Sequence, residues 1–136
     1  MIKVTYTELD GPSGPTLRLE AAGHAGYAPA GQDIVCAGAS ALMCALAGAL
    51  DTLGAQGVQR TLSAGHAAIA ADDRADVRAA FTVAVTGLRQ LAEAYPGHVA
   101  EDTGRAPAQE EPNGSTAAGC CPAAVPGSGQ QRKKET

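Results

Sequence analysis

The sequence lacks an excess of basic residues. Its 136 residues include ten Lys and Arg against 14 Asp and Glu, which gives a formal net charge of −4. The basic residues are scattered rather than gathered into a stripe. Domains that bind nucleic acid carry a basic footprint of that kind, so we expect no direct binding to DNA or RNA.

Membrane and export signals are also missing. We find no apolar run that approaches the roughly 18 residues that a membrane span needs. The N-terminal stretch MIKVTYTELD lacks the basic and apolar regions of a signal peptide. We therefore expect no membrane partner, and we predict a cytoplasmic protein.

The cysteine pattern excludes the common disulfide and zinc arrangements. The four cysteines are Cys36, Cys44, Cys120 and Cys121, and they form no CxxC pairs. In a cytosolic chain this pattern favours free thiols, one of which is a candidate for catalysis. A zinc site built from His24, Cys36 and His66 would need a ligand spacing that the sequence does not show. We expect no metal.

Phosphate-binding signals are absent as well. The glycine-bearing stretch from Gly26 to Gly31 is followed by Gln32 and Asp33 rather than by the GKS or GKT of a phosphate loop. No cofactor is therefore expected.

Periodicity predicts the secondary structure of the first half. Residues 2–6 and 17–21 alternate apolar with polar side chains on either side of a turn, which is typical of a β-hairpin. Three- and four-residue spacing then predicts an amphipathic helix from about Asp33 to Leu53, ending at Gly54. Its apolar positions are Ala39, Leu42, Met43, Leu46, Leu50 and Leu53.

The second half repeats the order of strands and helix. A weaker pair of strands is predicted at residues 58–62 and 66–71, and we expect loose packing there because Ile69 is the only large apolar residue of the second strand. Asp72 and Asp73 are predicted to cap a second helix. Residues 98–100 are predicted to form a last short strand. The apolar stripe of the second helix contains Val77, Phe81, Ala84, Val85, Leu88, Leu91 and Tyr95.

The composition changes at about Asp102. We predict one folded domain over residues 1–102 and a low-complexity tail over residues 103–136, whose only large aliphatic residue is Val125. Such a segment cannot bury enough surface to offset its ordering entropy, so disorder is expected. The role of the tail, with Cys120 and Cys121, stays open.

The candidate chemistry lies in the stretch GHAGYAPAGQDIVCAGAS, from Gly23 to Ser40. It begins with His24 at the end of a predicted strand and brings Cys36 to the third position of a helix capped by Asp33. Unpaired N–H groups and the helix dipole favour a thiolate there, and cysteine pKa values fall in such places. Ser40 shares the helix face of Asp33 and Cys36.

Two interpretations of these residues stay open at this point. A lone Cys beside an apolar helix is usually a small buried hydrophobe, and a lone His is usually a hydrogen-bonded residue. A thiol nucleophile with an imidazole proton shuttle is the competing interpretation. The convergence of a histidine, a glycine loop and a cysteine at one place favours the second.

The stretch GHAGYAPAGQDIVCAGASAL resembles the signature of the ribosomal-processing cysteine protease family Prp, and a similar layout extends from Met1 to about Glu101. The resemblance implies a small two-layer α/β (α+β) domain, with two main helices on a mostly antiparallel β-sheet. It also implies a homodimer. The match departs from the family in the tail, which is not part of its pattern.

The resemblance also implies a function. The enzyme would be a cysteine endopeptidase that removes a short N-terminal extension from large-subunit ribosomal protein number twenty-seven. Cys36 would be the nucleophile and His24 the general base, with Asp33 and Ser40 in supporting roles and helix-start N–H groups holding the oxyanion.

A mobile loop over residues 25–32 would close over the substrate peptide, with Gly26, Tyr27 and Gly31 at the substrate. The alternatives are a non-catalytic ribosome-associated module of the same fold that binds peptide, and a redox-sensing thiol protein.

Overall fold

The chain is described here by a computed structural model of residues 1–102. Residues 103–136, on which the predicted disordered tail falls, lie outside the described residues, as do Cys120 and Cys121.

A five-stranded sheet with the strand order β3-β4-β2-β1-β5 forms one layer of the domain. The neighbouring strands are antiparallel except for β1 and β5, which run parallel. The strands are β1 (Ile2–Gly11), β2 (Gly14–Ala22), β3 (Gln59–Ser63), β4 (His66–Asp72) and β5 (Val99–Asp102). The five strands predicted along the chain are present, although β1 and β2 together form a longer hairpin than the alternation indicated.

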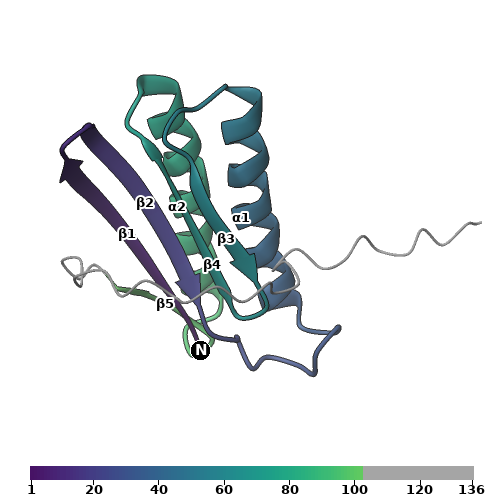
Figure 1. The fold of residues 1–136 in the computed structure, drawn as a ribbon. Coiled ribbons are helices and arrows are strands. Elements are labelled where there is room, and N and C mark those ends of the chain that lie inside the picture. Colours follow the sequence, from purple (N-terminus) through teal and green to yellow (C-terminus); the bar gives the residue numbers. More distant parts are fainter. Residues whose placement is uncertain (103–136) are drawn as a thin grey trace, which may run out of the picture.

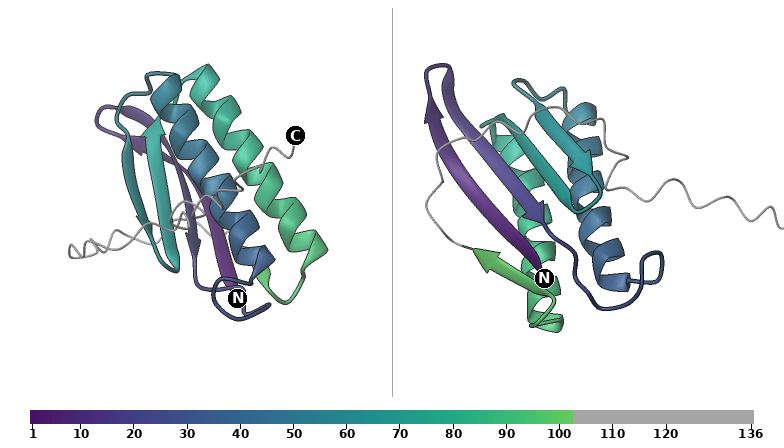
Figure 2. Two further views of the ribbon diagram at one scale, coloured as in Figure 1. Left: turned by 90° about the vertical axis from the view of Figure 1, so that its right-hand side faces the viewer. Right: turned by 60° about the horizontal axis from the view of Figure 1, so that its bottom comes forward.

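Two helices, α1 (Ile34–Thr52) and α2 (Ala75–Ala94), form the second layer and lie side by side on one face of the sheet (Figures 1 and 2). This is the predicted two-layer fold class. Among the elements of residues 1–102, no helix covers the other face of the sheet.

The core lies between the sheet and the helices. Leu17 and Leu19 of β2 and Ile69 of β4 are fully buried on the sheet side, and Phe81 of α2 is fully buried opposite them. Phe81 also packs against Tyr6 of β1, with ring centroids 6.4 Å apart. The apolar residues of the alternating strand pattern and of the helical pattern therefore pack into the same core.

Strand β4 is buried although Ile69 is its only large apolar residue. It lies inside the sheet between β2 and β3, and its residues 67–71 are all buried. The loose packing expected from the sequence stays a prediction.

The predicted caps of α2 are wrong in one respect. The N-cap is Arg74, which makes no side-chain capping bond, rather than Asp72 or Asp73. Arg74 instead donates from Nη2 to the carbonyl of Leu53 over 2.6 Å and to Asp76 over 2.8 Å. It thereby ties the start of α2 to the end of α1.

Helix α1 corrects the expectation that no apolar run approaches the length of a membrane span. It has 19 residues and a mean hydropathy of 1.8 over its apolar window, so by length and composition it could cross a membrane. The core helix of a globular domain passes the same test. In this fold α1 buries Val35, Met43, Leu46 and Leu50 against the rest of the domain.

Candidate active site

The stretch that joins β2 to α1, residues 23–33, lies at one end of the domain, where the N-terminus and the α2–β5 turn also lie (Figures 1 and 2). Gly23 sets its starting point. Its N–H donates to the carbonyl of Gly65 over 2.8 Å, and its φ is +101°. A Cβ on Gly23 would lie 2.4 Å from the carbonyl oxygen of Met1. The backbone therefore passes between β1 and the β3–β4 turn where only glycine fits.

Cys36 occupies the first turn of α1 as a free, partly buried thiol. Its Sγ accepts a hydrogen bond from the N–H of Ala25 over 3.3 Å. An N–H group stabilises negative charge on the acceptor that it faces. The sulfur thus lies at the start of a helix with a backbone donor directed at it.

His24 lies beside this sulfur without bonding to it. Its ring packs at the β3–β4 turn, where a Cβ on Gly65 would lie 2.7 Å from His24 Nε2. Because the Ala25 N–H that contacts Sγ belongs to the peptide after His24, the His24 Cα lies within about 6 Å of Sγ. The His24 side chain is exposed.

Asp33 caps α1, as predicted, and also holds the loop. Oδ1 accepts from the N–H groups of Val35 over 3.0 Å and Cys36 over 2.9 Å. Oδ2 accepts from those of Tyr27 over 2.9 Å and Ala28 over 3.3 Å. These donors, the N–H of Cys36 first, hold the pKa of the Asp33 carboxyl below its usual value.

The same capping bonds bear on the expected oxyanion site. Helix-start N–H groups were expected to hold the oxyanion, and two of them, those of Val35 and Cys36, donate to Asp33 Oδ1. The donor that faces the sulfur is instead the N–H of Ala25. Sequence reasoning missed this because a good N-cap side chain consumes the donors that an oxyanion would need.

The remaining predicted residues lie around this centre. Ser40 is buried in α1, one turn beyond Cys36. Gly26 and Gly31 have φ of +65° and +83°, a conformation that glycine adopts without strain. Tyr27 is 46% exposed, and its ring makes edge-to-face contacts with Tyr95 at 5.4 Å and His98 at 5.3 Å.

His98 is the neighbour of the site that sequence reasoning did not identify. Its Nδ1 lies 2.8 Å from the carbonyl oxygen of Ala25. The sequence separation is 73 residues, and no local pattern connects the two positions. His98 was assigned to a strand from the sequence, whereas β5 begins at Val99.

Two further observations concern the thiols and the candidate metal ligands of the described residues. Cys36 is free, as expected, but Cys44 is disulfide-bonded and does not fit the expectation of free thiols. Among residues 1–102, no group of three or more His, Cys, Asp or Glu side chains is placed to hold a metal ion.

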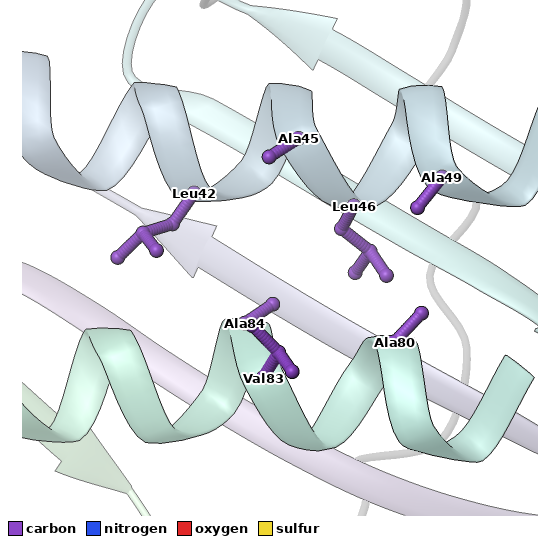
Figure 3. A pocket seen from close by; sticks show the side chains of 7 residues that line it. All are labelled: Leu42, Ala45, Leu46, Ala49, Ala80, Val83 and Ala84. Carbon is purple, nitrogen blue, oxygen red and sulfur yellow. The ribbon is translucent and has the colours of Figure 1, made fainter.

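An apolar groove of about 250 Å³ lies between α1 and α2 (Figure 3). None of the candidate site residues lines it, so it is not where the chemistry is expected. Its lining consists of Leu42, Ala45, Leu46, Ala49, Ala80, Val83 and Ala84.

Comparisons with known proteins identify the family and the fold of the chain. The model of a family described as cysteine protease Prp matches residues 1–100. Among curated proteins no relative matches the chain.

Solved structures with the same fold include an essential ribosomal processing protease Prp from S. aureus with a covalently linked product peptide. It is 24% identical, with a TM-score of 0.61, over 76% of this chain and 100% of that one. The same protease with a substrate peptide is 23% identical, with a TM-score of 0.57 and the same coverage. The protein SMU.848 from Streptococcus mutans is 29% identical, with a TM-score of 0.59, over 76% of this chain and 93% of that one.

Proposed function

The chain belongs to the family of cysteine protease Prp, and from that premise we propose that it removes a short N-terminal extension from the precursor of a large-subunit ribosomal protein, number twenty-seven. The substrate is the one that the sequence resemblance implies. Its class is supported by the S. aureus protease of the same fold, which is described as ribosomal processing and carries a substrate or product peptide.

Cys36 is the proposed nucleophile, and the observation that carries this assignment is the hydrogen bond from Ala25 N–H to its Sγ. A cysteine that served only as core filler would be buried among apolar side chains. Cys36 instead lies partly exposed at a helix start, in contact with a polar backbone group and next to a loop that precedes it.

His24 is the proposed general base and acid. In the reaction the imidazole takes the Cys36 thiol proton, the sulfur bonds to the scissile carbonyl carbon, and the resulting imidazolium gives its proton to the leaving amine as the C–N bond breaks. Water then attacks the thioester, which releases the acid and restores the thiol. The mechanism requires the His24 ring to approach Sγ through a rotamer change. Such a change is compatible with catalysis, because catalytic hydrogen bonds often form only in the substrate complex.

The oxyanion in this proposal is held by the Ala25 N–H, because Asp33 occupies the N–H groups of Val35 and Cys36. A tetrahedral oxyanion forms on the carbon bonded to sulfur, so a donor that already faces the sulfur lies close to where negative charge develops. Asp33 would hold the loop and Ser40 would support the helix face behind the sulfur. Gly26, Tyr27 and Gly31 would border the bound peptide.

The test is cleavage of a peptide that spans the predicted junction of the precursor from the same genome, followed by mass spectrometry. Wild-type protein should yield two fragments. Cys36→Ala should yield none, and His24→Asn should lower kcat by at least about a hundredfold, the scale of general-base catalysis. Val83→Ala, at a side chain that is 70% exposed on α2, is the matched control and should cleave like the wild type.

Cleavage that persists in Cys36→Ala would reject the assignment. A wild-type protein that binds the junction peptide without cleaving it would support the alternative of a peptide-binding module. The homodimer and the cytoplasmic location stay predictions of this proposal, and sedimentation velocity of the purified chain tests the first.

A further inference from the structure

The turn between α2 and β5 packs against the site loop although it is far away in the sequence. Its backbone is held at several points. The N–H groups of Gly97 and His98 donate to the carbonyl of Tyr95 over 3.1 and 3.0 Å, and the carbonyl of His98 accepts from the N–H of Ile2 over 2.8 Å. Both backbone polar groups of His98 are therefore in use, and its side chain projects from a fixed base.

The side chain of His98 meets the loop at Ala25. A carbonyl oxygen only accepts hydrogen bonds, so the 2.8 Å contact with Ala25 requires that His98 Nδ1 carries the proton and donates. Ala25 is 3% exposed, and its own N–H donates to Cys36 Sγ. One residue thus receives a bond from His98 on one side and gives a bond to the nucleophilic sulfur on the other.

These two bonds fix both peptide units that flank Ala25. The N–H belongs to the unit shared with His24, and the carbonyl belongs to the unit shared with Gly26. Gly26, at φ +65°, has no Cβ to restrain the second unit, so the bond from His98 adds to the restraint that Asp33 places on the N–H groups of Tyr27 and Ala28. The ring of His98 also packs edge-to-face on Tyr27, at an interplanar angle of 82°.

We infer that His98 is a positioning residue of the peptidase: by donating from Nδ1 to Ala25, it holds the Ala25 N–H against Cys36 Sγ and keeps His24 beside the sulfur. The inference rests on the proposed function for its effect on cleavage. It does not rest on that function for its effect on the reactivity of Cys36.

Three substitutions separate the hydrogen bond from the ring packing. His98→Asn keeps a donor nitrogen at the position of Nδ1 and removes the ring. His98→Phe keeps an aromatic ring against Tyr27 and removes the donor. His98→Ala removes both, and a thermal midpoint for each variant shows that it is folded.

For the junction peptide we expect kcat to fall about tenfold or more in His98→Phe and His98→Ala, with KM within about twofold of the wild type. His98→Asn should retain most of the wild-type kcat. The reverse order, with Phe active and Asn inactive, would overturn the inference in favour of aromatic packing. A change confined to KM would also overturn it, because it would assign His98 to substrate binding.

The second readout needs no substrate. The rate at which iodoacetamide alkylates Cys36 at pH 7, measured by mass spectrometry of the Cys36 peptide, depends on the thiolate fraction. This rate should fall in His98→Phe and be retained in His98→Asn, with Cys36→Ser as the blank. If the wild type cleaves no peptide but this order of rates appears, the proposed function fails while the positioning role stands. Equal rates in all variants would overturn the positioning role itself.

Discussion

Replacing Gly23 by alanine tests whether the close approach of three backbone segments holds the site loop in place. A Cβ on Gly23 would lie 2.4 Å from the Met1 carbonyl oxygen, about 1 Å closer than ordinary contact, at a φ of +101°. Met1 cannot move away freely, because its carbonyl shares a peptide unit with the Ile2 N–H that donates to His98.

The expected loss of stability is the sum of two effects. Backbone strain at such a φ costs about 1–3 kcal/mol, and a disrupted Ile2–His98 hydrogen bond costs about 1 kcal/mol. Gly23→Ala should therefore lower the free energy of unfolding by about 3 kcal/mol. For a domain of this size that is a fall of roughly 12–24 °C in the midpoint of thermal unfolding.

Gly26→Ala is the matched control. Gly26 also has a positive φ, +65°, but a Cβ there would meet nothing within 4 Å. Its cost is the left-handed conformation alone, about 1 kcal/mol. Urea unfolding followed by far-UV circular dichroism gives both values. If the two variants lose the same stability within about 0.5 kcal/mol, the reasoning from close approach is refuted.

Two further predictions concern the core and the cap. Phe81→Ala removes a fully buried ring and should lower the free energy of unfolding by about 3–5 kcal/mol, whereas the exposed Val83→Ala should change it by less than about 0.5 kcal/mol; similar urea midpoints for the two would contradict the assigned core. The pKa of Asp33 is lowered, chiefly because its carboxylate accepts from the N–H of Cys36. The charged carboxylate therefore stabilises the fold above the unfolded pKa of about 3.9. This stabilisation is lost as the pH falls through the pKa of the folded state. Asp33→Asn should thus be less stable than the wild type at pH 7, with a difference that shrinks towards pH 2 in urea titrations; a difference independent of pH would argue against a charged cap.

Much of the fold was predictable from short-range patterns. The alternation around Leu17 and Leu19 predicts a strand, and the three- and four-residue spacing from Ala39 to Leu50 predicts α1, because each pattern reports a face that a neighbouring layer must cover. The cap at Asp33 was predictable for the same reason, since its partners Val35 and Cys36 lie two and three positions away.

Predictions that needed a neighbour from another element were less successful. The alanines of β4 did not indicate that its place between β2 and β3 would bury residues 67–71. Helix-start N–H groups were expected to hold the oxyanion, and the cap at Asp33 accepts from two of them, those of Val35 and Cys36. Arg74 rather than Asp72 or Asp73 begins α2, because contacts with Leu53 and Asp76 hold it there.

The sequence by itself determined the elements and the cap of α1, because those features depend on residues close together along the chain. Tertiary structure decided which groups the loop contacts: the His24 ring lies against Gly65, and His98 holds Ala25. These contacts exist only because strand order brings the end of β2, the β3–β4 turn and the α2–β5 turn to one end of the domain. The local periodicity of the sequence does not predict which of these segments contact one another.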